Sequence, residues 1–159
     1  MRAGIVSDIH GSFFNLLRAV KSMGNIDLLI HAGDGAADIV KLQGRYSFRI
    51  EAVKGNCDSC DIFPEEALFE IDGYRIFLCH GHRYGVKTGI QPLLARARAE
   101  KADVAVYGHT HEALICTERG ILLINPGSLY YGRAPGGPSY AILETMPDGG
   151  LAHYICRIF

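Results

Sequence analysis

The apolar residues of this chain gather in short runs, and in the first half of the sequence these runs alternate with helix-like segments. Residues 2–7 form the first run, typical of a buried strand. Apolar side chains then recur at helical spacing from Phe13 to Met23, and Gly24 is a natural helix stop. Further strands are predicted over residues 27–31, 48–53, 74–79 and 103–107. The alternation predicts an α/β fold.

A second helix is predicted shortly after residue 88. Thr88 and Gln91 have the spacing of a capping box, and apolar residues follow at helical intervals from Ile90 to Ala97. From about residue 112 the pattern changes to strand–turn–strand. Strands are predicted over residues 112–117, 121–124, 139–144 and 151–158. We therefore expect an α/β first half that finishes in an antiparallel meander.

Length and composition limit the function classes. The 159 residues fit one domain over residues 1–159, and 48% hydrophobic residues suffice for a core. Sixteen basic residues against 17 acidic ones argue against a general nucleic-acid binder. No apolar run approaches the ~18 residues of a membrane span. Because Asp8 and His10 interrupt the N-terminal apolar stretch, no signal peptide is expected, and the predicted location is cytoplasmic.

The five cysteines lie mostly inside apolar runs, which indicates small buried side chains in a reducing compartment. Cys57 and Cys60 have the spacing of half a zinc site or a redox pair. No second pair of this kind exists, and the neighbouring Asn56 and Asp58 favour another use for the segment.

Five of the predicted strands end in a polar cluster at their C-terminal ends. The clusters are Asp8-Ile9-His10-Gly11 and residues 31–35, 55–58, 80–82 and 108–111. Ligands of α/β sheets bind outside the carboxyl ends of the strands, so we expect the clusters to converge on one surface. Six of the seven histidines lie in or beside them.

The clusters supply carboxylate, imidazole and amide donors. Such an oxygen and nitrogen set suits Mn²⁺, Fe, Ni²⁺, Co²⁺ or Zn²⁺. Seven candidate ligands are too many for one ion with open positions and fit a pair of ions, which a carboxylate such as Asp34 can bridge at ~3.5–4 Å. The candidates are Asp8, His10, Asp34, Asn56, His80, His109 and His111.

These motifs occur in a familiar order. The sequence D-x-H-G at Asp8 is followed by G-D, G-N-x-D, H-G-H and G-H-T-H, which resembles the calcineurin-like metallophosphoesterases. The compact length, the GNCD form and the NPGS segment at residues 125–128 are similar to the small prokaryotic phosphodiesterase branch of that superfamily. The resemblance extends from Asp8 to Ser128.

The resemblance implies an α/β fold built as a two-sheet β sandwich flanked by helices. It also implies two divalent ions, with Mn²⁺ the expected metal, and in-line attack on a phosphoester by a metal-bridging hydroxide. The implied ligands are Asp8, His10 and His111 for the first ion and Asn56, His80 and His109 for the second, with Asp34 as the bridge. Asn56 would also hold phosphoryl oxygens in the transition state.

One position departs from the wider superfamily. Many members have a histidine, thought to protonate the leaving group, where this chain has Cys57. A thiol is a poorer proton donor to an alkoxide and a better metal ligand or inert filler. The branch that the chain resembles commonly has cysteine there, so activity remains expected, with a preference for acidic leaving groups such as those of aryl diesters.

Further residues beside the ligands are candidates for catalysis or substrate binding. Asp58 and His82 are predicted catalytic residues, although Asp58 could instead cap a turn and His82 could support a ligand. Arg83 is a predicted substrate contact, or else ordinary surface. His31 is expected to be packed or hydrogen-bonded near the ligands, and His153 to be structural.

The expected function is that of a phosphodiesterase acting on a small phosphoester, with a homodimer as a possible assembly. The alternatives are a non-catalytic interaction scaffold on the same fold, a phosphomonoesterase and a nuclease. Scaffolds of this kind typically lose ligands, whereas all seven positions here carry competent side chains, which favours an enzyme. The near-neutral charge argues against the nuclease.

Overall fold

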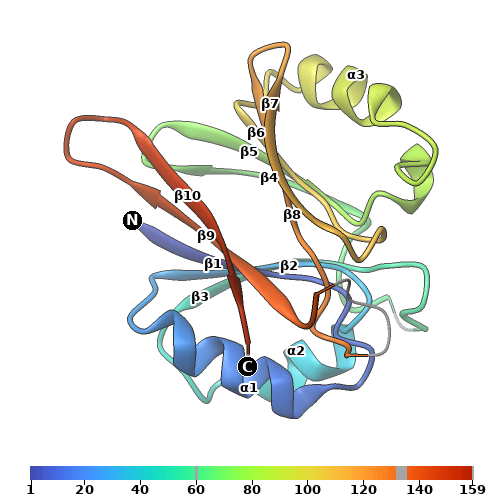
Figure 1. Ribbon diagram of the computed structural model, residues 1–159, viewed down its shortest axis with the longest axis vertical. Helices are drawn as coiled ribbons and strands as arrows, with labels where there is room; N and C mark the ends of the chain where they lie inside the picture. Colours follow the sequence, from blue (N-terminus) through green and yellow to red (C-terminus); the bar gives the residue numbers. More distant parts are fainter. Residues whose placement is uncertain (60, 132–135, 159) are drawn as a thin grey trace.

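Two five-stranded β-sheets pack face to face in the computed structural model, which describes residues 1–59, 61–131 and 136–158 (Figure 1). The first sheet has the order β10 (Leu151–Arg157), β9 (Ser139–Thr145), β1 (Arg2–Val6), β2 (Leu28–Ala32) and β3 (Arg49–Val53). The second has the order β4 (Glu66–Ile71), β5 (Tyr74–Cys79), β6 (Val104–Val106), β8 (Ile121–Pro126) and β7 (Ala113–Glu118). Cys60, the second half of the CxxC pair, lies outside the described residues.

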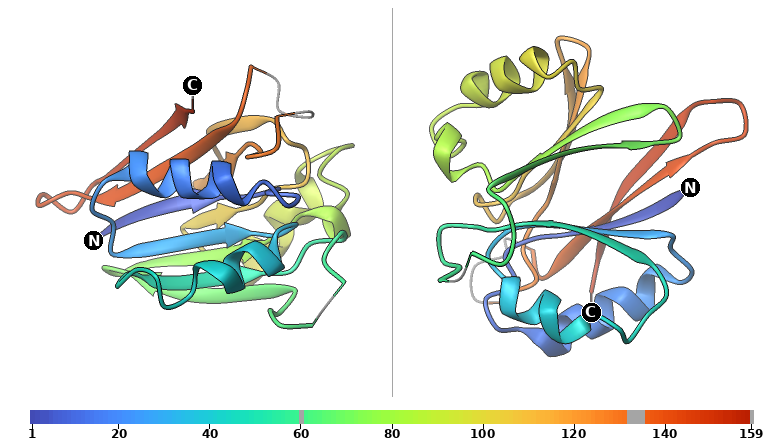
Figure 2. Two further views of the ribbon diagram at one scale, coloured as in Figure 1. Left: turned by 90° about the horizontal axis from the view of Figure 1, so that it is seen from below. Right: turned by 180° about the vertical axis from the view of Figure 1, so that it is seen from behind.

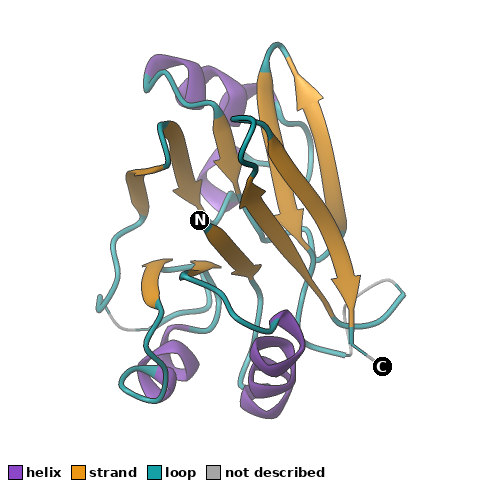
Figure 3. Ribbon diagram, turned by 90° about the vertical axis from the view of Figure 1, so that its left-hand side faces the viewer, coloured by secondary structure: helices purple, strands orange, loops and turns teal. Residues whose placement is uncertain are grey.

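Helices cover the outer faces of the sheets (Figure 3). Helices α1 (Phe13–Met23) and α2 (Ala36–Leu42) lie against the first sheet, whereas α3 (Gln91–Ala99) and the short 3-10 turn η1 (His82–Tyr84) lie on the side of the second (Figure 2). The expected two-sheet sandwich flanked by helices is therefore confirmed. No helix of the described residues is long and apolar enough to cross a membrane.

Alternating side chains of each strand pack into different layers of the core. In β1, Ile5 points between the two sheets and Val6 points toward the helices, and both are fully buried. Leu28 and Ile30 of β2 join Ile5 in the inner layer. Burial on both faces explains why these strands appear in the sequence as continuous apolar runs.

The expected C-terminal meander is wrong. Strands β7 and β8 form an antiparallel hairpin, but β8 also pairs in parallel with β6 in the second sheet. The chain then crosses to the first sheet, where β9 pairs antiparallel with β1 and β10. The two hairpins therefore belong to different sheets, and both contribute apolar side chains to the core between these sheets.

Three smaller expectations also differ from the structure. Strand β4 and helix α2 were not predicted from the pattern. The capping box is wrong, because α3 begins at Gln91 with Ile90 at its N-cap. The Thr88 hydroxyl donates instead to the carbonyl oxygen of Gly85 at 2.9 Å.

The loops that follow the strands of both sheets meet at one end of the sandwich. The backbone N–H of Asp8, after β1, donates to the carbonyl of Gly33 after β2 at 2.9 Å. In the second sheet, the N–H of Gly108 after β6 donates to the carbonyl of His80 after β5 at 3.1 Å. The polar clusters therefore converge as expected, but from two sheets.

Candidate metal centre

The backbone at this end of the sandwich is unusual. Five of the eight described non-glycine residues with positive φ are candidate ligands, with φ between 46° and 68°. Such a left-handed conformation is uncommon for residues with a side chain, and it persists where the surrounding contacts enforce it, often at functional sites. The five residues are Asp8, His10, Asp34, His109 and His111.

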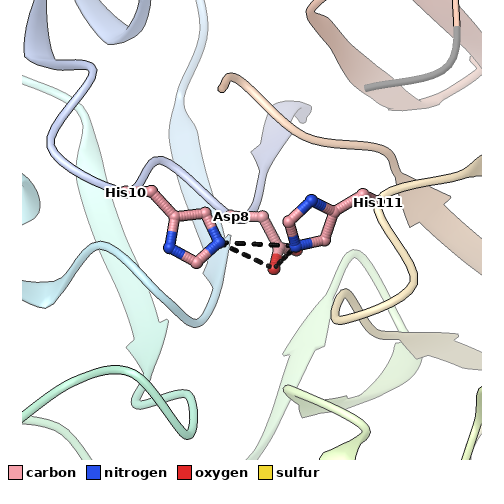
Figure 4. Close-up of side chains that lie close together, drawn as sticks. All are labelled: Asp8, His10 and His111. Atoms are coloured by element: carbon pink, nitrogen blue, oxygen red, sulfur yellow. Dashed lines mark hydrogen bonds and ion pairs between the residues drawn. The ribbon is translucent and has the colours of Figure 1, made fainter. Parts of the chain in front are cut away.

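The first group of ligands consists of Asp8, His10 and His111 (Figure 4). The Oδ1 atom of Asp8 lies 3.0 Å from Nε2 of His111 and 3.7 Å from Nε2 of His10. The two Nε2 atoms are 3.4 Å apart. One carboxylate oxygen and two imidazole nitrogens thus point at a common centre.

The two oxygens of the Asp8 carboxylate differ in their partners, and only one of them is left for a cation. Its Oδ2 atom accepts hydrogen bonds from the Ser7 hydroxyl at 2.6 Å and from the backbone N–H of His109 at 3.0 Å. Its Oδ1 atom is buried among the described residues without a hydrogen-bond partner. Burial opposes ionisation, but contacts with His10 and His111 outweigh it and hold the pKa of Asp8 well below its usual range. A divalent ion at Oδ1 fits this donor set.

The second group lies around His80. Its Nε2 atom is 3.1 Å from Oδ1 of Asn56 and 3.3 Å from Oδ2 of Asp34. Its Nδ1 atom is 2.7 Å from the carbonyl oxygen of Ala32, to which a protonated Nδ1 donates, leaving the Nε2 lone pair for a metal. The ring of His109 lies 5.1 Å from that of His80, centroid to centroid.

Asp34 lies between the two groups. Its Oδ2 atom is 3.3 Å from Nε2 of His80 and 3.8 Å from Nε2 of His10, while Oδ1 accepts the backbone N–H of Cys57 at 2.8 Å. Burial raises the pKa of Asp34, but the hydrogen bond and charge of His80 exceed this effect and lower it to about 2. An ionised carboxylate at this position can contact an ion in either group.

Two glycines let these loops approach closely. A Cβ atom on Gly55 would lie 2.0 Å from Oδ1 of Asp34, and one on Gly108 would lie 1.9 Å from the Ser7 hydroxyl and 2.7 Å from Oδ2 of Asp8. Any side chain at Gly55 or Gly108 would therefore displace a candidate ligand. This is the physical reason for glycine in the G-N-x-D and G-H-T-H motifs.

The predicted catalytic residues Asp58 and His82 occupy different surroundings. Asp58 is half-buried, and its carboxylate accepts backbone N–H bonds from Asp34, Gly35, Ala36 and Gly55 at 2.8–3.0 Å. His82 lies beside the ligands, its ring 5.4 Å from His80 and 6.1 Å from His109. Burial and then the charge of His80 lower the pKa of His82.

The predicted substrate contact Arg83 is exposed, and its guanidinium pairs with Glu65. Glu65 also lies 3.4 Å from the ammonium of Lys54. His31 is fully buried, and both of its ring nitrogens are without a hydrogen-bond partner in the described structure. His153 lies exposed on β10, away from the clusters.

Sequence reasoning assigned no role to several residues that hold the ligand loops. Asn125 donates through Nδ2 to the carbonyl of Gly108 and to the Thr110 hydroxyl, both at 3.0 Å. Ser128 donates to the carbonyl of Asp8 at 2.8 Å. The NPGS motif was the signal for both, but a motif alone does not tell which loops its side chains reach.

Comparison with known proteins agrees with this arrangement. The chain matches the family model of the calcineurin-like phosphoesterase superfamily domain over residues 1–148. It is 35% identical over 157 residues to the probable metallophosphoesterase YsnB of Bacillus subtilis strain 168. The aligned region covers 97% of this chain and 90% of that protein. It is 32% identical over 162 residues to a phosphodiesterase of Methanocaldococcus jannaschii, covering 91% and 93% of the two chains.

Among solved structures, Vacuolar Protein Sorting 29 from Cryptosporidium parvum superposes with a TM-score of 0.76 at 20% identity, covering 98% of this chain and 96% of that one. At this identity the likeness concerns the fold alone. The family match and the two relatives go further, and with them the expectation of a metal-dependent phosphoesterase of the small prokaryotic type is confirmed. The chain belongs to the calcineurin-like phosphoesterase superfamily.

Proposed function

We propose that this protein is a phosphodiesterase that works with two divalent ions. Asp8, His10 and His111 would hold one ion, and Asn56, His80 and His109 the other, with Asp34 contacting both. The observation that carries the proposal is the position of Asp34, whose Oδ2 atom lies within 3.8 Å of a ring nitrogen in each group.

Bound ions of this kind make water nucleophilic near neutral pH and offset the negative charge of a phosphoryl group. The side chains around them would do the rest. Asn56 is exposed, with its Oδ1 atom toward His80. Its Nδ2 atom donates one hydrogen to Sγ of Cys57 at 3.4 Å, and the second hydrogen of the amide can donate to a phosphoryl oxygen. His82 is a further candidate contact because it borders His80 and His109.

The charge around the centre favours a diester over a monoester. A monoester carries a charge of about −1.5 to −2 at neutral pH, whereas a diester carries a single negative charge. Glu65 pairs with Arg83, and Lys54 pairs with Asp61 at 2.5 Å as well as with Glu65, so two carboxylates largely neutralise these two cations. We therefore assign a singly charged substrate. Cys57 is a weak proton donor, which favours acidic leaving groups such as those of aryl diesters.

Hydrolysis of bis(p-nitrophenyl) phosphate and of p-nitrophenyl phosphate tests the proposal. Metal-stripped protein should be inactive. Added Mn²⁺ should restore the highest turnover, and added Ni²⁺, Co²⁺ or Zn²⁺ should restore less. The diester should be hydrolysed in preference to the monoester. Asp34→Asn should lower bound metal and turnover together. Asp61→Asn is a suitable control for metal content, because Asp61 is exposed and its carboxylate contacts Lys54 rather than a candidate ligand. Metal binding at two sites without turnover of either ester would point to the scaffold alternative.

A further inference from the structure

A hollow of about 250 Å³ opens directly beside the candidate metal centre. Two candidate ligands, His10 and Asp34, form part of its wall, so the hollow and the centre share side chains. The exposed thiol of Cys57 forms another part. The hollow therefore adjoins the place where the phosphoryl group of a substrate would lie.

The other walls leave space, and their charged groups are two carboxylates and one ammonium, those of Asp38, Asp58 and Lys41. Gly11, Gly35 and Ala37 contribute no bulk beyond a methyl group. The ammonium of Lys41 lies 3.1 Å from Oδ1 of the buried Asp38, whose Oδ2 accepts the backbone N–H of Gly11 at 3.1 Å. Asp38 balances Lys41, and Asp58 adds a carboxylate whose oxygens accept backbone N–H groups, so no cation of the lining is left for a second phosphate and the hollow is suited to an uncharged group.

The volume limits the size of the guest. Sites for drug-sized ligands measure about 300–1,000 Å³, so 250 Å³ suits a single ring rather than a whole nucleotide. We propose that the hollow binds one uncharged ester arm of the substrate, about the size of one aromatic or sugar ring. This subsite rests on the proposed function, since the phosphoryl group of that ester has to lie at the metal centre.

Protection of Cys57 from alkylation tests the subsite without requiring turnover. Diphenyl phosphate and dimethyl phosphate carry the same charge, but only the first has ring-sized arms. On Mn²⁺-loaded protein, diphenyl phosphate should slow alkylation of Cys57 by iodoacetamide about fivefold or more, and dimethyl phosphate at equal concentration should not. Fragment-ion mass spectrometry locates the modified cysteine. Equal protection by both esters, or protection by neither, would overturn the proposal.

Filling the hollow provides a second test. Ala37 is exposed on α2, so Ala37→Leu keeps a good helix former while it occupies the space. We expect this variant to lose the protection by diphenyl phosphate and to raise KM for bis(p-nitrophenyl) phosphate about fivefold or more, with metal content unchanged. Ala95→Leu, at an exposed position of α3, is the matched control.

The results separate the subsite from the proposed function. Protection by diphenyl phosphate without any turnover would support the subsite and contradict the phosphodiesterase. Turnover with an unchanged KM in folded Ala37→Leu would contradict the subsite and leave the phosphodiesterase standing. If Ala37→Leu does not fold, as judged by circular dichroism, the comparison of the two esters on the unsubstituted protein still decides.

Discussion

Asp58 binds the backbone of Asp34, with Oδ2 of Asp58 accepting the N–H of Asp34 at 2.9 Å. The same oxygen accepts the N–H of Gly55 at 2.8 Å, and Oδ1 accepts those of Gly35 and Ala36. One carboxylate thus ties the loop after β2 to the loop after β3. It supports the left-handed conformation of Asp34, whose φ is 58°.

Asp58→Asn should mainly lower the affinity for metal, with little effect on the rate of proton transfer. The amide replaces one acceptor oxygen by a donor that faces two backbone N–H groups, so two of the four hydrogen bonds are lost. We expect metal affinity to fall about 10–100-fold, as for other supports of metal ligands, and the free energy of unfolding to fall by about 2 kcal/mol. Chelator competition and urea denaturation measure the two effects.

The control for this variant is Asp61→Asn, which removes a carboxylate that is 89% exposed. It should change metal affinity less than twofold. An Asp58→Asn variant with normal metal affinity, normal KM and a shifted pH–rate profile would instead support the predicted catalytic role of Asp58.

Glu65→Gln should alter the choice between monoester and diester. The substitution releases Arg83 from its carboxylate, whereas Lys54 keeps its ion pair with Asp61, and the loss of one negative charge raises the positive potential near His82. We expect kcat/KM for p-nitrophenyl phosphate to rise about threefold at low salt, with little change for the diester, and the gain to shrink at high salt. Glu100→Gln, which breaks an ion pair with Arg96 on α3, is the control. An unchanged ratio of the two activities would show that Arg83 has no part in substrate choice.

His31 should make the metal-free protein less stable in acid. Burial lowers the pKa of His31 to about 4, against about 6.5 in the unfolded chain. Between these values the unfolded chain binds a proton that the folded protein does not, so stability falls as the pH drops from about 6.5 to 4. The slope from this group is at most about 1.4 kcal/mol per pH unit.

His31→Leu has no such proton to bind and tests this origin. Its free energy of unfolding, from urea denaturation of metal-stripped protein between pH 4 and 7.5, should fall less steeply with acid than that of the unsubstituted chain. The difference between the two proteins should be constant above pH 7. Parallel curves over the whole range would assign the acid sensitivity to other groups.

Much of the centre could be predicted because its signals are local. Asp8 and His80 each follow a buried apolar run directly, and the carboxyl ends of such strands collect ligands. Strand β4 gave no comparable signal, since Glu66 and Glu70 interrupt it and most of its side chains are partly exposed. Helix α2 has seven residues, too few for a clear helical period.

The backbone conformation and ring orientation of the ligands could not be predicted from the sequence, for a different reason. The positive φ of Asp34 depends on a carboxylate 24 residues away, and the orientation of the His80 ring depends on the carbonyl of Ala32 in another sheet. The residues next to Asp34 and His80 in the sequence do not indicate such contacts. The same holds for Arg83, since nothing near it in the sequence indicates that Glu65 neutralises it.

Asn125→Asp should loosen the loop that carries His109 and His111. The buried Asn125 donates to the Gly108 carbonyl and the Thr110 hydroxyl, and its Oδ1 accepts the N–H of Gly127 at 3.0 Å. An ionised carboxylate keeps the acceptor but loses both donors, and it places a buried charge against a carbonyl oxygen. We expect the free energy of unfolding to fall by about 2–4 kcal/mol and metal affinity to fall about 10-fold.

Urea denaturation and chelator competition at pH 7 measure these changes, with the exposed Asn25→Asp as the matched control. The metal result separates loop position from general stability, because a variant that is less stable but still folded should bind metal normally unless His109 and His111 have moved. Full metal affinity in a destabilised Asn125→Asp variant would therefore show that residues 108–111 keep their ligand geometry without Asn125. In that case, contacts within the centre itself, such as the hydrogen bond from the His109 N–H to Asp8, would be sufficient to hold the loop.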